Sequence, residues 1–160
     1  MNKLPSALLA LFILGGCAST NADSSCISSG TRWVNGNSGS SEMNPGMDCI
    51  ACHKNSQEGP QYAMAGTVYS DGADADTCDG LSGVSVELKS VDTGETVTAT
   101  SNGAGNFFLR NVPFSGKYTA RVIANGKARA MVSAQTSGAC NSCHTAAGGS
   151  GAPGRVIIPN

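Results

Sequence analysis

One pentapeptide pattern occurs twice in this chain of 160 residues, and it constrains the fold more than any other feature. Cysteine, two variable residues, cysteine and histidine follow one another at residues 49–53 (CIACH) and again at residues 140–144 (CNSCH). The chain has 2 histidines, and each closes one copy of the pattern. Any fold of this chain must therefore present two cysteine pairs, each followed directly by a histidine.

The spacing predicts covalent attachment of a c-type haem at each copy. Two thiols three positions apart can form thioethers to the two vinyl groups of one haem, and the histidine that follows supplies the proximal ligand of the iron. The predicted cofactors are thus two haem c groups, held by Cys49, Cys52, Cys140 and Cys143 and ligated by His53 and His144. The alternative is a structural zinc site built from the same residues.

The sixth ligand of each iron is a separate question. Because the chain has no third histidine, bis-histidine ligation is excluded within it. Met43 lies just before the first motif, and Met131 shares the polar face of a predicted strand with Lys127 and Arg129. We expect these two methionines to be the candidate metal ligands, and methionine ligation raises the reduction potential. A water-bound or vacant position remains open for either iron.

The chain begins with features of an exported protein. Lys3 precedes an apolar run at residues 8–14, as in a secretory signal peptide, which we place at residues 1–16. The three residues before Cys17 (LGG) resemble the lipobox of bacterial lipoproteins, and this resemblance implies lipidation of Cys17. Ala18 follows instead of an aspartate, which by the same resemblance favours the outer membrane. An ordinary signal peptide is the alternative.

The cysteine count agrees with this scheme. Of the 7 cysteines, one is assigned to lipid and four to haem, which leaves Cys26 and Cys78. Disulfides persist in exported proteins, so we expect these two to pair, with two free thiols as the alternative. Residues 17–46, rich in Ser, Asn and Gly, are expected to carry the lipidated cysteine on a flexible tether.

Short strands with alternating apolar residues fill the space between the two motifs. Turn residues separate them, which predicts a mainly β protein with an antiparallel β-sandwich. The expected strands lie at residues 65–70, 84–88, 95–100, 105–110, 118–124 and 128–132, and residues 155–158 form a candidate seventh strand. Pro45 and Gly46 indicate a turn, so we expect the first motif to lie on a loop or one short helical turn.

Four segments in this region follow the order seen in carboxypeptidase regulatory-like domains: 66–69 (GTVY), 83–88 (GVSVEL), 105–109 (GNFFL) and 116–118 (GKY). The resemblance covers residues 65–134 and implies a seven-stranded, transthyretin-like sandwich without catalytic residues of its own. Residues 47–64 and 135–160 then form the two haem-binding segments, before the first and after the sixth strand. Six alternating strands would bring both motifs to one pole of the sandwich.

Composition limits the function. The formal net charge is −1 and no basic patch is present, so nucleic acid is excluded as an expected partner. We expect an exported, membrane-anchored dihaem cytochrome c that passes single electrons between redox proteins, and not an enzyme. One alternative is a haem-bearing assembly module that stacks into an electron-conducting filament. Another is peroxidase-like activity at a five-coordinate haem.

Overall fold

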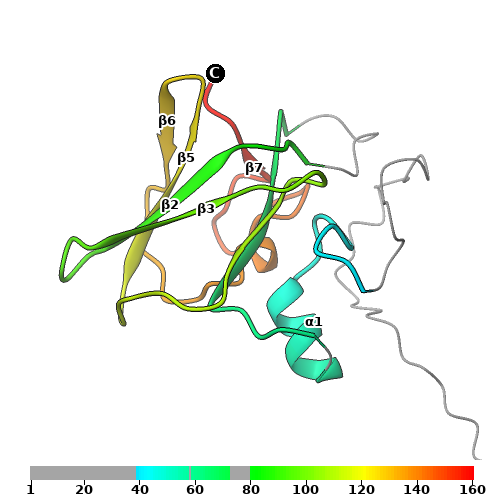
Figure 1. The fold of residues 1–160 in the computed structure, drawn as a ribbon. Coiled ribbons are helices and arrows are strands. Elements are labelled where there is room, and N and C mark those ends of the chain that lie inside the picture. The colour runs from blue at the N-terminus through cyan, green and yellow to red at the C-terminus, as the bar shows by residue number, and fades with distance from the viewer. Residues whose placement is uncertain (1–38, 58, 73–79) are drawn as a thin grey trace, which may run out of the picture.

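The computed structural model describes residues 39–57, 59–72 and 80–160, which form a sandwich of two β-sheets (Figure 1). The three-stranded sheet has the order β4 (Asn106–Leu109), β1 (Met64–Tyr69), β7 (Val156–Ile157). The four-stranded sheet has the order β3 (Thr96–Thr100), β2 (Ser85–Ser90), β5 (Tyr118–Ala124), β6 (Lys127–Ala130). The predicted mainly β sandwich is confirmed, including its short seventh strand.

All strand pairs are antiparallel except β1 with β7. The exception arises because the chain after Gly138 runs parallel to β1 along its open edge. Ala139 first forms a bridge with Ala65, and β7 later pairs with the same edge. A Cβ atom at Gly138 would lie 1.8 Å from the carbonyl oxygen of Ala63, so only glycine permits this approach. The second motif is thereby held against the first strand.

The core lies between the two sheets and follows the predicted alternation of apolar residues. Val86 and Leu88 of β2 are buried, as are Tyr118 and Val122 of β5. The opposite sheet contributes its own buried side chains, Met64, Val68 and Phe107. Burial of each large apolar side chain is worth roughly 1.5–3 kcal/mol, so this cluster supplies most of the driving force for folding.

The predicted alternation is wrong for the last hairpin strand. Ala128, Ala130 and Val132 were expected to face the core, but every residue of β6 is exposed, and Val132 is 102% exposed. The register pairs Arg129 with the core residue Val122 and Ala130 with the exposed Arg121. Because directly paired residues share a face of the sheet, Ala128 and Ala130 lie on its outer face.

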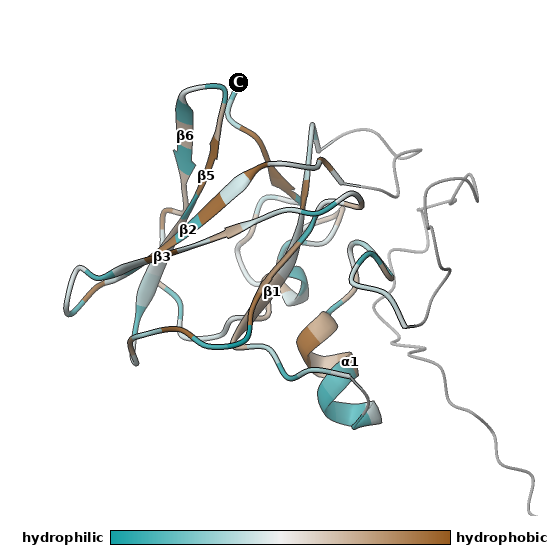
Figure 2. Cartoon of the chain, viewed as in Figure 1, coloured by the Kyte–Doolittle hydropathy of each residue, from teal (hydrophilic) through white to brown (hydrophobic). Residues whose placement is uncertain are grey.

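The segment around the first motif is more ordered than expected. The motif starts an eight-residue helix, α1 (Cys49–Ser56), in place of a loop or a single turn. Asp48 caps it, because its carboxylate accepts a hydrogen bond from the Ala51 amide at 3.0 Å. Figure 2 shows that the first turn of α1 is hydrophobic and its C-terminal half hydrophilic, which suits a helix with one end against the sheet.

The expected tether also ends earlier than residue 46. Residues 39–46 form turns against the three-stranded sheet, where the Gly46 amide donates to the Thr67 hydroxyl at 2.8 Å. The Asn106 side chain likewise donates to the Met43 carbonyl at 2.9 Å. These bonds pair backbone groups that a tether would leave to water, so this stretch belongs to the folded domain.

Three predicted residues, Cys17, Cys26 and Cys78, lie outside the described residues, as does the signal peptide. Lipidation and the Cys26–Cys78 disulfide therefore stay predictions. Among the helices of the described residues, none is long and apolar enough to cross a bilayer.

Candidate functional site

The two motifs lie side by side along β1. The second motif begins in a short 3₁₀ helix, η1 (Cys140–Ser142), and both η1 and α1 contact β1. A direct bond joins the motifs, because the Asn141 amide of the second donates to the Met47 carbonyl, two residues before the first, at 2.9 Å. The two motif segments are therefore neighbours along β1, and the predicted position of both haems at one pole of the sandwich stays a prediction.

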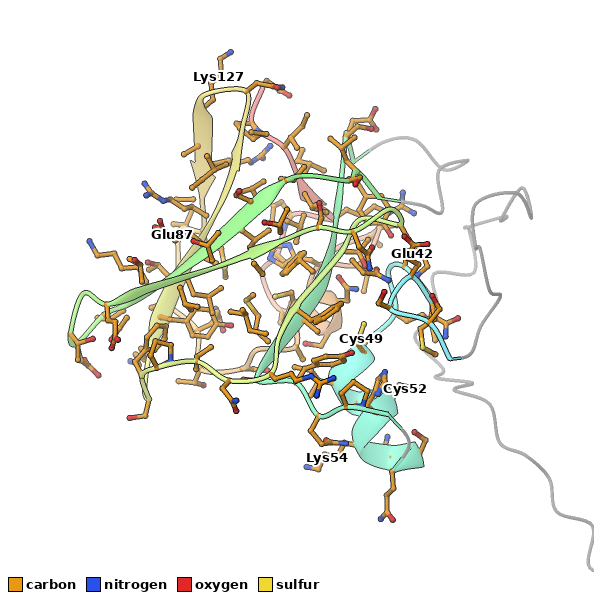
Figure 3. The ribbon with its side chains drawn as sticks, viewed as in Figure 1. Glu42, Cys49, Cys52, Lys54, Glu87 and Lys127 are labelled. Carbon is orange, nitrogen blue, oxygen red and sulfur yellow. The ribbon has the colours of Figure 1, made fainter. Side chains whose placement is uncertain are left out.

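In the first motif, the helix places its three functional residues on one face. Cys52 and His53 follow Cys49 by three and four positions, the spacings at which helical side chains are neighbours. Figure 3 labels the two cysteines on α1. The Cys49 thiol lies 3.5 Å from the Met47 carbonyl oxygen. Cys52 is disulfide-bonded in this structure. Since a thioether needs a thiol, the disulfide and haem attachment are alternative states of the Cys52 sulfur.

The imidazole of His53 is packed but incompletely paired. Its ring meets the Tyr62 ring edge-on, with centroids 5.3 Å apart, and Tyr62 in turn packs on Phe108 at 4.8 Å. The buried Nδ1 atom of His53 has no hydrogen-bond partner in the described part of the chain. A buried polar atom left unpaired costs about 1–3 kcal/mol, and such atoms in native proteins call for an ion, a water or a functional role. A metal-ligating imidazole is one such role.

Beside this ring the backbone comes unusually close. A Cβ atom at Gly59 would lie 2.6 Å from His53 Nδ1, and Gly59 has φ +71°. Both the contact and the backbone angle therefore favour glycine at this position. Gly59 thus sets the space available to the ring.

The second motif opens onto a cavity of about 350 Å³ between the sheets. This volume falls in the range of ~300–1,000 Å³ that is usual for cofactor and ligand sites. Apolar side chains from both sheets form much of its wall, among them Val86, Phe107, Val122, Val156 and Ile157. The motif residues that line the same cavity are Cys140, Cys143 and His144.

The hydrogen bond of His144 determines which ring nitrogen is available. Its Nδ1 atom lies 2.8 Å from the Gly154 carbonyl oxygen. A carbonyl can only accept, so Nδ1 carries the proton and Nε2 keeps its lone pair. This is the arrangement by which proteins fix the tautomer of a metal-binding histidine. The donor atoms at this motif therefore fit a haem iron.

Burial raises the pKa of the first thiol of each motif. Desolvation, together with the negative charge of Asp48, raises the pKa of Cys49 to about 11. Desolvation and the nearby Cys49 sulfur raise the pKa of Cys140 to about 12. In the folded, haem-free chain both thiols are therefore protonated at neutral pH.

The two candidate methionine ligands differ in position. Met131 lines the cavity together with His144, so a sixth ligand and a proximal ligand are both available there. Met43 lies in the turns over the outer side of the three-stranded sheet, where its backbone accepts the bond from Asn106. Ligation by either methionine stays a prediction.

Several residues of the site carry no signal in the sequence. Tyr118, in the strand predicted at residues 118–124, lines the cavity, and its hydroxyl donates to the Ser137 carbonyl at 2.5 Å. Burial raises the pKa of Tyr118. The Gly154 carbonyl contacts His144 across a loop of the same segment, whereas the buried Asn141 amide contacts Met47, 94 residues away in sequence. The cysteine–histidine motif identifies neither group.

The zinc alternative requires three or four ligands on one point. Within residues 39–57, 59–72 and 80–160, no three His, Cys, Asp or Glu side chains are grouped closely enough to hold a metal ion.

Comparisons with known proteins address the sandwich. Residues 64–141 match the family model of the carboxypeptidase regulatory-like domain. No curated protein and no solved structure matches the chain. The matched residues contain all of β1 to β6 and end inside the second motif, at Asn141, whereas the first motif precedes them. The sandwich of this chain is thus supported as a carboxypeptidase regulatory-like domain, the family that the sequence resembles.

Proposed function

We propose that this protein is an exported, membrane-anchored dihaem cytochrome c that carries single electrons between redox proteins. The observation that carries the proposal is the tautomer of His144 and its place beside the two cysteines of its motif. Its Nδ1 is bonded to the Gly154 carbonyl, which leaves Nε2 for a metal, and the two cysteines of the same motif line the same cavity. These residues provide the three things that covalent haem attachment requires: two thiols, one imidazole and a space beside them.

The residues that would hold the two groups follow from the motifs. Cys140 and Cys143 would form the thioethers of one haem, with His144 as proximal ligand and Met131 as its sixth ligand. Cys49, Cys52 and His53 would hold the other, with Met43 as the candidate sixth ligand. When bound, haem supplies one-electron redox chemistry, whose potential depends on the axial ligands.

The cavity wall supports this assignment. Its apolar side chains would exclude water from the cofactor face, which is one of the means by which a protein tunes a redox potential. Arg121, Arg129 and Arg155 also line the cavity. Guanidinium groups pair well with carboxylates, so these side chains suit the negatively charged propionates of a haem. Arg121 pairs with Glu87 at 2.8 Å, and the Arg155 guanidinium lies over the Tyr69 ring at 4.5 Å.

The cellular setting is proposed from the sequence. Lipidation at Cys17 would anchor the protein in the bacterial outer membrane, and a Cys26–Cys78 disulfide would form in the same oxidising compartment. The expected partners are other redox proteins, such as cytochromes, which share the proposed chemistry of this chain.

Motif variants test the proposal. The protein is produced with bacterial c-type haem attachment machinery, and haem per chain is counted by the alkaline pyridine spectrum. Cys140→Ser with Cys143→Ser should remove one haem, and Cys49→Ser with Cys52→Ser should remove the other. Ser142→Ala, in a variable position of the second motif, is the matched control and should retain both. Equal haem content in all variants would contradict the proposal, and a high-spin spectrum would favour the peroxidase-like alternative.

A further inference from the structure

Asn141 occupies a variable position of the second motif, yet its side chain makes three hydrogen bonds. It is 4% exposed. Its Oδ1 accepts from the Thr67 amide at 3.1 Å, and its Nδ2 donates to the Thr67 hydroxyl at 3.1 Å and to the Met47 carbonyl at 2.9 Å. One side chain thus binds the middle of β1 and the lead-in of the first motif at the same time.

These bonds belong to a buried polar network on the outer side of the three-stranded sheet. The Thr67 hydroxyl donates to Asn106 at 2.8 Å and accepts from the Gly46 amide at 2.8 Å. With the bond from Asn141, this hydroxyl uses its one proton and both lone pairs. A fully satisfied buried network is rigid and specifies one arrangement, because any change leaves a buried polar group unpaired.

Covalent haem attachment does not explain this residue. Attachment uses the two cysteines and the histidine and makes no demand on the residues between the cysteines. The neighbouring variable residue, Ser142, is exposed, and its hydroxyl has only local partners, the Ala139 carbonyl at 2.6 Å and the Cys143 sulfur at 3.7 Å. The two variable positions therefore differ in role, and Asn141 alone of the pair links the motifs.

We propose that Asn141 is a positioning residue that clamps the two motifs to each other across β1 and so fixes the separation of the cofactors they hold. The clamp itself concerns the polypeptide, whereas its effect on the cofactors rests on the proposed function. A side-chain amide is required because the site presents both acceptors and a donor. Asn141→Asp would keep the bond from the Thr67 amide but lose both donated bonds, and Asn141→Leu would lose all three.

The first arm of the experiment measures amide hydrogen exchange on the full-length chain without haem. In Asn141→Leu and Asn141→Asp, the Thr67 amide and residues 43–52 should exchange about 10- to 100-fold faster, because loss of the clamp opens this segment locally. Amides of β2 and β5 should be unchanged. Ser142→Ala should match the parent protein at every site. Unchanged exchange at residues 43–52, or an equal rise in β2 and β5, would overturn the clamp.

Thr67→Val provides a second variant that tests the same network from β1. It removes the hydroxyl at nearly constant volume and should speed exchange at residues 43–52 as well. If the Asn141 variants fail to fold, this variant decides the question by the same comparison with β2 and β5.

The second arm uses the haem-loaded protein and the circular dichroism of its Soret band, which is split when two haems lie at a fixed short separation. The splitting should weaken in the Asn141 variants at unchanged haem content and stay intact in Ser142→Ala. An unchanged split band would overturn the effect on the cofactors. Absence of haem from the parent protein would refute the proposed function instead, and the exchange result on the clamp would still stand.

Discussion

The two histidines of this protein are held in different ways. His144 has its tautomer set by the Gly154 carbonyl before any metal arrives, whereas the buried Nδ1 of His53 has no partner in the described residues. A preset tautomer removes one reorganisation step from metal binding. We infer that the second motif is the better prepared of the two sites.

A single-residue test concerns Met131, the proposed sixth ligand of the haem iron in the cavity. Met131→Leu removes the thioether but nearly conserves volume, so the free energy of unfolding should change by less than about 1.5 kcal/mol. Haem content should stay the same, and the far-red absorption band of methionine-ligated ferric haem should weaken or vanish. Met43→Leu is the matched control for the other motif. Retention of the full band in the double variant would exclude both methionines.

The buried thiols provide a pH test on the haem-free protein. Burial raises the pKa of Cys49 from 9.0 to about 11 and that of Cys140 from 9.0 to about 12. Their alkylation by iodoacetamide should therefore rise about tenfold per pH unit up to pH ~11, because only the thiolate reacts. Peptide mapping after quenching measures each site, and the urea-unfolded chain is the control. A plateau near pH 9 in the folded protein would contradict the burial.

The same shifts predict how stability depends on pH. A folded-state pKa above the unfolded value means that burial favours the neutral thiol. The stabilising effect is then complete below pH ~9 and is lost as the pH rises through about 11 for Cys49 and about 12 for Cys140. Cys49→Ala and Cys140→Ala should each reduce the alkaline loss of unfolding free energy. An alkaline loss identical to that of the parent protein would contradict this assignment.

Among the elements, β1 is the one on which both motifs depend, and Gly66 is its critical residue. A Cβ atom there would lie 2.7 Å from the Phe107 ring and 2.8 Å from the Cys140 Cβ. Gly66→Ala should thus lower the free energy of unfolding by about 1–3 kcal/mol through overpacking. In Gly72→Ala the new atom would lie 3.9 Å from Ile157, an ordinary contact, so this control should be near neutral. Urea unfolding measures both, and equal stability of the two variants would contradict the packing.

Much of the element structure could be predicted from the sequence. Alternation in β2 and β5 identifies strands because one face of each packs on the core. The same alternation misleads in β6, because periodicity does not reveal that the register places Arg129, and not Ala128 or Ala130, on the face of the core residue Val122. The helix α1 is longer than predicted. The turn signals of Pro45 and Gly46 lie before Asp48, the residue that caps the helix, and therefore do not limit its length.

The site was predictable to a different degree. The motif cysteines and histidines are evident from local spacing alone. Asn141 and its partner Thr67 are 74 residues apart in sequence, so their bond depends on the tertiary fold. The cavity likewise needs strands from both sheets, and Met131 could be proposed as a ligand only because it interrupts a polar face.

At the scale of the whole molecule, the sandwich serves as a scaffold that brings together two motifs separated by about half the chain. The first covers the outer side of the three-stranded sheet, while the second opens onto the cavity between the sheets. Covalent attachment suits such a scaffold, because a bonded cofactor does not need a deep enclosing pocket. The predicted anchor would then hold this unit at a membrane surface.

The anchor has a direct test in bacterial cells. Cys17→Ser should move the protein from the membrane fraction to the soluble periplasmic fraction, because the lipid chains supply the binding energy. Cys26→Ser is the control and should stay with the membrane. Equal membrane association of both variants would refute lipidation at Cys17.

The most direct measurement of the central claim is the number of haems covalently bound per chain in the purified mature protein, counted by alkaline pyridine spectroscopy and intact mass, with zinc assayed on the same sample. The account predicts two haems per chain, low-spin spectra in both redox states, and no stoichiometric zinc. A mature chain without haem, with zinc in its place or with Cys52 still in a disulfide, would contradict it.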